Sequence, residues 1–154
     1  MKKFTHFLVF VGIVSTIFLS CQPIENCEDV ECYLPIDSVY FELIDQASNL
    51  NAFTSGVLDT TAYYVVNNDL EVIPNNYLKE SGLIEFPDIL SNTGRIVYQL
   101  VLQNDIVISF VLDVERKEID CCKEQQIREF KVIATPFEFN SETKTAILRV
   151  DLQP

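Results

Sequence analysis

RIVYQLVLQNDIVISFVLD, residues 95–113, holds two alternating apolar runs on either side of a polar centre. With a three-residue loop at 103–105, Leu100 lies opposite Ile108 and one face of the pair is wholly apolar. A two-residue loop would instead place Ser109 opposite Leu100. Because the buried face sets strand register, the stretch predicts a β-hairpin with the three-residue loop. Such loops usually need a residue with a left-handed backbone, a conformation that Asn and Asp tolerate. The predicted pairs are Leu102–Ile106, Leu100–Ile108, Tyr98–Phe110 and Ile96–Leu112 on the apolar face, and Val101–Val107, Gln99–Ser109, Val97–Val111 and Arg95–Asp113 on the other.

Period-two alternation, typical of half-buried strands, extends in both directions from this hairpin. The first strand is predicted to bury Val39, Phe41 and Leu43, and the last Ala146, Leu148, Val150 and Leu152. Other strands are predicted at 61–66, 71–73, 83–86, 127–135 and 137–139, with one helical turn at 87–90 and a charged turn at 115–120. Seven or eight short strands separated by turn residues predict a single all-β domain, an antiparallel β-sandwich.

The first 20 residues have the layout of a secretory signal peptide. Lys2 and Lys3 precede a mostly apolar run at 4–19, which polar residues such as Thr5 interrupt. This run of 16 residues is shorter than the roughly 20 apolar residues of a spanning helix. We therefore expect a cleaved signal peptide at 1–20, with an uncleaved single-span anchor as the alternative.

The end of the run, Phe18-Leu19-Ser20-Cys21, resembles the relaxed lipobox of Bacteroidota lipoproteins. In that motif the Cys is lipidated and becomes the mature N-terminus, and Phe18 stands where an aliphatic residue is preferred. Two or more acyl chains anchor a protein stably, whereas one gives only marginal binding. We therefore expect Cys21 to carry the lipid anchor. The alternative is ordinary cleavage near Ser20, with Cys21 in a disulfide.

Residues 21–154 are strongly acidic, with nine of the 11 Lys and Arg and all 23 Asp and Glu of the chain. The resulting net charge of −14, without a basic cluster, disfavours nucleic acid and anionic headgroups as partners. His6, the only His, lies in the leader, so we expect no imidazole base, Ser-His-Asp triad or catalytic zinc. The few glycines are too widely separated for a phosphate-binding loop, and no cofactor is predicted.

Residues 21–36 are predicted to form an acidic tether between the lipid and the domain at 37–154. In Bacteroidota surface lipoproteins, acidic residues directly after the lipidated Cys act as an outward-export signal. Here the first of them, Glu25, comes a few places later. A solvated linker without a sorting role is therefore an equal alternative.

Four cysteines remain besides Cys21, and an even number in an exported domain predicts two disulfides. Cys121 and Cys122 are adjacent, so their Cα atoms lie about 3.8 Å apart, below the roughly 4.4 Å that a disulfide needs. Each is expected to pair with one of Cys27 and Cys32, in either combination. A local Cys27–Cys32 bridge is the alternative, and the spacings do not fit a zinc site.

Acidic residues crowd the stretch 113–120, namely Asp113, Glu115, Glu118 and Asp120. Calcium prefers such oxygen ligands, but the ordered spacing of a calcium loop is absent, so a solvated edge is favoured and no metal is predicted. A glycosidase with paired carboxylates needs no His, and composition alone does not exclude it. A small sandwich, however, has little room for a deep cleft.

Tyr63 and Tyr64 point to opposite faces if they lie on a strand, so one of them should be exposed. Exposed aromatic side chains can stack on sugars or contact a partner, but without Trp we favour packing at the rim of the core. Ser38 and Thr60 lie in Asp-Ser-Val and Asp-Thr-Thr, which resemble the short Bacteroidota O-glycosylation sequon. They are candidate modification sites.

The whole layout resembles small Bacteroidota lipoproteins with a transthyretin- or immunoglobulin-like sandwich. The resemblance rests on the lipobox, the Cys-bearing tether, the alternating strands and the Cys-Cys pair in DCCKEQQIREFKV. It implies fold and location only, with the lipid in the outer membrane and the domain facing the periplasm or the exterior. We expect a lipid-anchored, non-catalytic binding or structural module of the cell envelope, with an envelope protein or glycan as partner. The alternatives are a small carboxylate-dependent glycan hydrolase and an accessory subunit of an outer-membrane uptake or adhesion assembly.

Overall fold

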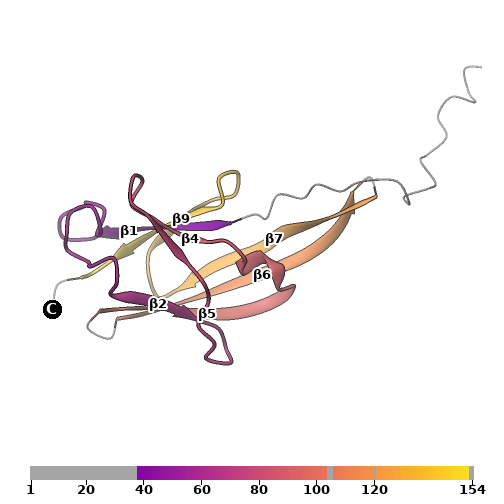
Figure 1. The fold of residues 1–154 in the computed structure, drawn as a ribbon, viewed down its shortest axis with the longest axis horizontal. Helices are drawn as coiled ribbons and strands as arrows, with labels where there is room; N and C mark the ends of the chain where they lie inside the picture. The colour runs from indigo at the N-terminus through magenta and orange to yellow at the C-terminus, as the bar shows by residue number, and fades with distance from the viewer. Residues whose placement is uncertain (1–37, 104–105, 120, 153–154) are drawn as a thin grey trace, which may run out of the picture. The chain divides into compact units, whose positions relative to one another are not determined.

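A computed structural model describes residues 38–103, 106–119 and 121–152, all of which lie in the unit of the chain that spans Tyr33–Pro154. The predicted signal peptide, Cys21, Cys27 and Cys32 fall outside these residues. The described part contains nine strands and one 3-10 helix, η1 (Figure 1). The elements are β1 (Val39–Asp45), β2 (Tyr63–Val66), β3 (Asn76–Leu78), β4 (Leu83–Phe86), η1 (Ile89–Ser91), β5 (Gly94–Leu102), β6 (Val107–Ile119), β7 (Cys122–Ile133), β8 (Phe137–Asn140) and β9 (Thr145–Val150).

The strands form two sheets that pack against each other. Sheet A has the order β3-β4-β1-β9-β8, and sheet B has the order β2-β5-β6-β7. Phe41 of β1 joins the two sheets, because its ring lies 5.0 Å from that of Phe86 in sheet A and 4.8 Å from that of Phe110 in sheet B, measured between centroids. The predicted all-β sandwich is confirmed, with nine described strands where seven or eight were expected.

The hairpin formed by β5 and β6 has the predicted register. Leu100 pairs with Ile108 and Val101 with Val107, and the backbone N–H of Leu102 donates to the carbonyl of Ile106 at 2.8 Å. The remaining predicted pairs down to Arg95–Asp113 also hold. The three-residue loop is therefore confirmed, although two of its residues, 104 and 105, are outside the described residues.

Alternation along the strands produces the core. The inward positions of β1, Val39, Phe41 and Leu43, are fully buried. The same is true of Ala146 and Leu148 in β9, and the predicted Val150 and Leu152 are also buried. Most inward residues of β5 and β6 join this cluster, because period-two alternation puts every second side chain on the same face.

Two predicted elements, a strand and a turn, are wrong. The predicted strand at 71–73 contains only an isolated bridge, between Val66 and Val72, and the next strand begins at Asn76. The predicted charged turn at 115–120 is instead a continuation of β6 to Ile119, and β7 already begins at Cys122. Charged residues can form a solvent-exposed strand when opposite charges face each other across the ladder and stabilise the pairing, as in Lys117–Glu124 and Glu118–Lys123.

One strand pairing departs from the antiparallel pattern. β1 and β9, the first and last strands, run parallel in the middle of sheet A, from Tyr40–Thr145 to Asp45–Val150. The helical turn predicted at 87–90 is present as η1. In the part of the chain that the structure describes, no helix has the length and apolar character needed to cross a membrane.

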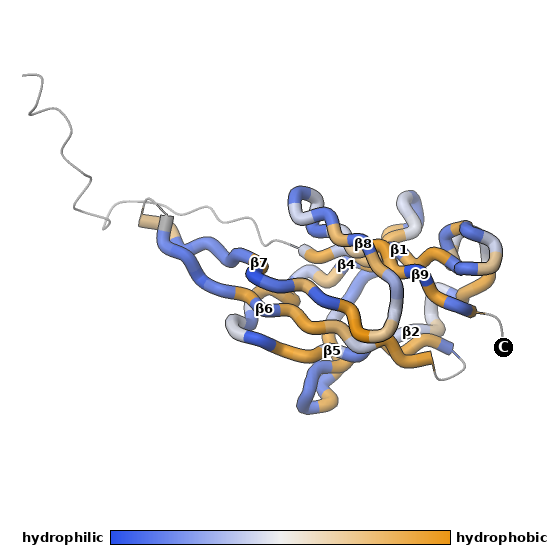
Figure 2. Tube along the Cα trace, turned by 180° about the vertical axis from the view of Figure 1, so that it is seen from behind, coloured by the Kyte–Doolittle hydropathy of each residue, from blue (hydrophilic) through white to orange (hydrophobic). Residues whose placement is uncertain are grey.

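The distal parts of β6 and β7 form an arm, defined here as residues 115–119 and 121–126. The ladder between β5 and β6 ends at the Gly94–Val114 pair, so beyond it the arm strands pair only with each other. A register shift between Asp113 and Val114 marks where the arm begins, as expected for a β-bulge. In Figure 2 the arm is mostly hydrophilic, in contrast to the sandwich strands that it continues.

Candidate functional site

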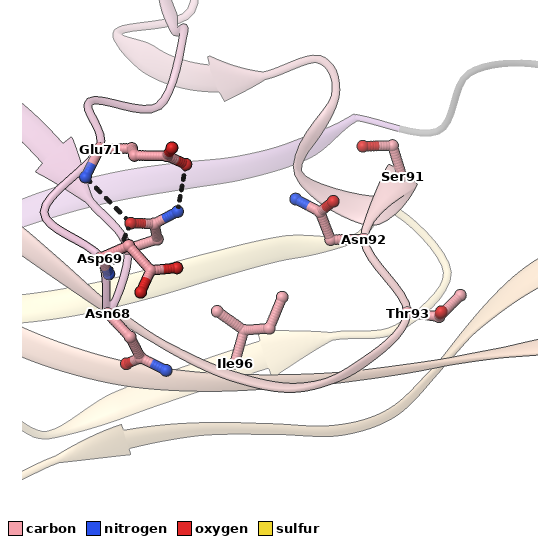
Figure 3. A pocket seen from close by; sticks show the side chains of 8 residues that line it. Asn68, Asp69, Glu71, Ser91, Asn92, Thr93 and Ile96 are labelled. Carbon is pink, nitrogen blue, oxygen red and sulfur yellow. Dashed lines mark hydrogen bonds between the residues drawn. The ribbon is translucent and has the colours of Figure 1, made fainter.

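A polar cleft lies where the turn after β2 faces the segment that leads into β5 (Figure 3). Its volume is about 470 Å³, within the range of small-ligand sites. One wall is the turn at 67–71, and the other is the segment 91–93 with Ile96 of β5. Pairing of β2 with β5 brings the two walls together, although some 20 residues separate them in the sequence.

Asn67 organises the first wall. Its side-chain oxygen accepts hydrogen bonds from the backbone N–H groups of Asp69 (2.9 Å) and Glu71 (3.0 Å), and its amide nitrogen donates to Glu71 Oε2 at 3.0 Å. Leu70 has a left-handed backbone, with φ of 62°, which closes the turn. Asn67 therefore holds the turn in shape, and this wall also presents Asn68 and the carboxylates of Asp69 and Glu71 to a ligand.

The second wall offers hydroxyl and amide groups. The hydroxyl of Ser91 donates to the carbonyl of Asp88 at 2.7 Å, so its oxygen remains able to accept. The side chain of Asn92 is hydrogen-bonded to the buried hydroxyl of Tyr98. Burial raises the pKa of Tyr98, and this hydrogen bond partly offsets the effect. Thr93 completes the wall, and Ile96 at the base supplies a half-buried apolar surface.

This lining is suited to hydrogen-bonding a neutral, polar ligand. Asp69 and Glu71 lie on the same wall, two residues apart in one exposed turn, and the facing segment 91–93 has no acid. A glycosidase instead places its two carboxyl groups on either side of the bond that it cleaves. Among the described residues, no three His, Cys, Asp or Glu side chains are grouped so that they could hold a metal ion.

The predicted cysteine pair lies at the tip of the arm. Cys121 is in the turn and has a left-handed backbone, with φ of 71°, while Cys122 begins β7 opposite Ile119. Neither residue is a free thiol. Their predicted partners, Cys27 and Cys32, are outside the described residues, as is the predicted lipid site Cys21, so the pairing and the lipidation remain predictions.

The described acids of the stretch predicted at 113–120, Asp113, Glu115 and Glu118, are spread along β6. Glu115 forms an ion pair with Arg128 across the hairpin at 3.5 Å, and Glu118 lies opposite Lys123. Asp113 stands between Arg95 and Glu129 in the ladder, and Arg95 binds Glu129 at 2.9 Å. Basic neighbours therefore accompany the acids, which agrees with a solvated edge. Asp120 is outside the described residues.

The two candidate glycosylation sites differ in accessibility. Thr60 is exposed, next to a turn in which Asp59 accepts hydrogen bonds from the hydroxyl of Thr61 at 2.7 Å and from its N–H at 2.8 Å. These two hydrogen bonds lower the pKa of Asp59. Ser38 is half-buried and donates to Glu85 Oε1 at 2.9 Å. Of the two residues, only Thr60 therefore has an accessible hydroxyl that could accept a glycan.

The adjacent tyrosines of β2 divide between the two faces, as predicted. Tyr63 packs against Phe53, with ring centroids 5.4 Å apart, and burial raises its pKa. Tyr64 is 49% exposed on the outer face of sheet B. Neither tyrosine lines the polar cleft. The cleft itself was not predicted, because Asn-Asn-Asp and Ser-Asn-Thr-Gly read as ordinary turns until the partner of β2 is known.

The chain was compared with protein-family models, curated proteins and solved structures, and it matches none of them.

Proposed function

We propose that this protein is a lipid-anchored, non-catalytic binding module of the cell envelope, and that its polar cleft takes a small polyhydroxylated ligand such as the end of a glycan. The lining of the cleft is the observation that carries this proposal. The turn at 67–71 offers the amide of Asn68 and the carboxylate of Asp69, and the facing segment 91–93 offers the amide of Asn92 and the hydroxyl of Thr93. Hydroxyl groups of a sugar both donate and accept hydrogen bonds, so a cleft lined by both hydrogen-bond donors and acceptors suits them.

The arrangement of carboxylates supports binding rather than hydrolysis. Asp69 and Glu71 share one wall, and Glu71 also accepts a hydrogen bond from Asn67, which fixes its direction. A hydrolase would need an acid on the facing wall to protonate the leaving group or activate water. Such an acid is missing from the segment 91–93.

The anchor is proposed from the leader and from charge. Lys2, Lys3, the apolar run at 4–19 and the lipobox-like end at Cys21 are in the order that export and lipidation require. A net charge of −14 over residues 21–154 repels anionic headgroups, so acyl chains on Cys21 would supply the attachment that the surface cannot.

Anchoring is tested by fractionation of cells that express the full chain or Cys21→Ser. We expect the unchanged chain in the membrane fraction and the variant in the soluble fraction or retained as an unprocessed precursor. A soluble, unprocessed wild-type chain would refute the proposed anchor but would not bear on the proposed ligand binding in the cleft.

Ligand binding is tested by ligand-observed NMR on the purified full chain, with neutral di- and trisaccharides as probes. We expect Asp69→Asn to weaken binding about fivefold, the equivalent of one hydrogen bond, and Glu142→Gln, which neutralises an exposed acid in the β8–β9 turn, to leave it unchanged. Equal affinity in both variants would refute the cleft as the site. Release of reducing sugar during the measurement would instead favour the hydrolase.

A further inference from the structure

A second cavity lies between the base of the arm and the β8–β9 hairpin. Its volume is about 330 Å³, and it is lined by residues 124–127 of β7 and by Phe139, Ser141 and Lys144 of the hairpin. β7 and β8 are the last strands of their sheets, so the cavity lies on an open side of the sandwich. We call it the arm groove. It shares no lining residue with the polar cleft.

The apolar part of the arm groove is continuous with the core. Ile127 and Phe139 pack against the core cluster but are only half-buried. The ring of Phe139 stacks on that of Phe130 with 4.5 Å between their centroids, and the ring of Phe130 in turn lies 5.8 Å from that of Phe41. Apolar surface that remains accessible in this way gains free energy when another segment covers it.

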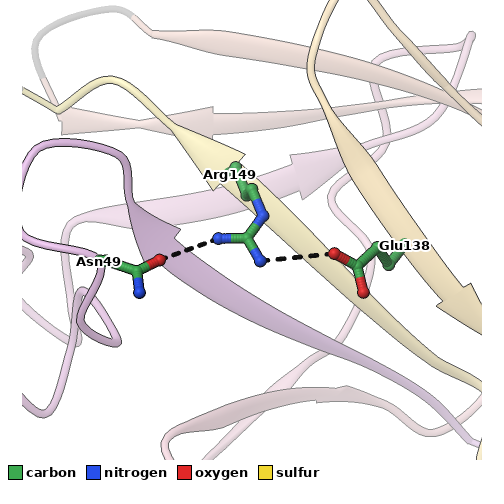
Figure 4. A network of polar contacts seen from close by, with 3 residues as sticks. All are labelled: Asn49, Glu138 and Arg149. Atoms are coloured by element: carbon green, nitrogen blue, oxygen red, sulfur yellow. Dashed lines mark hydrogen bonds and ion pairs between the residues drawn. The ribbon is translucent and has the colours of Figure 1, made fainter.

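The hairpin wall of the arm groove is fixed from its opposite face. Arg149 of β9 donates to Glu138 of β8 at 3.4 Å and to Asn49, in the loop after β1, at 3.0 Å (Figure 4). These side chains lie on the outer face of sheet A, whereas Phe139, the next residue of β8, packs inward. The contacts therefore stabilise the wall independently of anything that covers the groove.

The first described strand begins at the rim of the arm groove. The backbone N–H of Tyr40 donates to the carbonyl of Lys144 at 2.9 Å, and the hydroxyl of Ser38 donates to Glu85 at 2.9 Å. β1 runs parallel to β9, which starts at Thr145, directly after Lys144. The chain before Ser38 therefore leaves sheet A at the end where β9 begins. In Figure 1, β1 begins on the side of the sandwich from which β6 and β7 extend.

Residues 33–37, with the sequence Tyr-Leu-Pro-Ile-Asp, are the segment that enters β1 from this rim. They lie outside the described residues but within the compact unit that begins at Tyr33. All four acids of the predicted tether come before them, at 25–31, so the last part of the tether is mainly apolar. A solvated linker keeps such side chains in water, whereas a docked segment buries them.

The segment is also long enough to follow the arm. Five extended residues span about 17 Å, and the five steps of β7 from Ile127 to Cys122 span about the same distance. Alternation continued back from Val39, which is buried, would direct Asp37 to the inner side of sheet A. Lys144, of opposite charge, lines the groove at that point.

We propose that residues 33–37 dock along the arm groove, with their apolar side chains against Ile127 and Phe139 and with Asp37 next to Lys144. The segment then closes the open side between β7 and β8 and belongs to the domain rather than to the tether. The predicted tether is correspondingly shorter, and its last part is fixed to the sandwich. This docking does not depend on a ligand in the polar cleft.

Docking is tested on the full chain, extracted in detergent, by urea unfolding. We expect the double substitution Leu34→Ser and Ile36→Ser to raise the equilibrium constant for unfolding about tenfold or more, because burial of one aliphatic side chain is worth at least that factor. Ile24→Ser with Val30→Ser is the matched control, since both residues precede Tyr33 in the tether, and it should change the constant by less than about twofold. An unchanged constant in the first variant would overturn the proposal, and it is the result expected if a separate ligand or solvent occupies the groove.

Two further measurements locate the segment. Phe139→Leu should also destabilise the chain, and the cost of Leu34→Ser with Ile36→Ser should be smaller in its background, because the effects of residues in contact are not additive. Carbodiimide should link Asp37 to Lys144 within one chain, and Asp37→Asn should abolish that link. Additive costs, or the absence of the link in the unchanged chain, would overturn the proposal, since the segment would then lie elsewhere.

Discussion

Phe41→Ala should cause the largest loss of stability of any single substitution at the joint between the two sheets. Phe41 is fully buried, and its ring makes edge-on contacts with Phe86, Phe110 and Phe130 at 5.0, 4.8 and 5.8 Å. Truncation of a buried Phe to Ala costs about 3–5 kcal/mol, since the removed ring leaves a cavity. Each aromatic pair is worth about 0.5–1.5 kcal/mol beyond its buried area. With three partners, we expect the upper end of the range, about 4–5 kcal/mol.

The loss is measured by urea unfolding of the full chain, followed by far-ultraviolet circular dichroism. A loss of this size is a third or more of the 5–15 kcal/mol typical of a domain, so the variant should unfold at much lower urea. Tyr64→Ala is the control, because Tyr64 is exposed on the outer face of sheet B, and it should cost about 1 kcal/mol or less. A cost below about 1.5 kcal/mol for Phe41→Ala would refute the role of Phe41 as the joint between the sheets.

Three further effects should be measurable, the first two in the same unfolding assay and the third by peptide mapping together with that assay. Gly56→Ala should cost about 1–2 kcal/mol, because φ is 77° there and the site is open, while Gly82→Ala, at φ of 70°, should cost more, since the new Cβ would lie 2.9 Å from its nearest side-chain neighbours. Hydrogen bonds from the side chain and backbone of Ser48 lower the pKa of Asp45 below its ordinary 3.8. The stabilising effect of the ionised Asp45 is therefore complete above pH 3.8 and is lost as the pH falls through the lower folded pKa. Asp45→Asn should weaken the dependence of stability on pH in this acidic range, and an unchanged dependence would contradict the role of Asp45. Peptide mapping under non-reducing conditions should find Cys121 and Cys122 in disulfides with the two tether cysteines. Reduction of these disulfides should lower the free energy of unfolding by about 4–5 kcal/mol if one loop of roughly 90 residues is opened. A disulfide between the two tether cysteines would contradict this pairing.

The alternation of the sequence predicted which residues are buried but not which strands are neighbours. The register of the hairpin at 95–113 followed from one local rule, because a shift by one residue would have buried Ser109. The parallel pairing of β1 with β9 joins segments about 100 residues apart, and nothing in either strand specifies its partner or direction. The cleft depends on such a non-local pairing, that of β2 with β5. For this reason it could not be located from its own residues.

The arm shows a second reason why part of the fold could not be predicted from the sequence. Residues 115–119 are charged, which suggests a turn when the segment is considered alone. In the folded chain Lys117 faces Glu124 and Glu118 faces Lys123, so the charges stabilise a solvated strand pair instead. The cysteine pair, recognised from its spacing, lies at the end of this arm rather than next to the core.

We propose that this acidic sandwich is held at a membrane through Cys21, and the mass of the mature N-terminal peptide is the most direct measurement of that attachment. The chain is expressed in a bacterial host, extracted from membranes, digested and analysed by mass spectrometry. We expect residues 1–20 to be absent and the peptide to begin at Cys21 with acyl chains attached. A peptide that begins at Cys21 without lipid, or that still carries the leader, would contradict it.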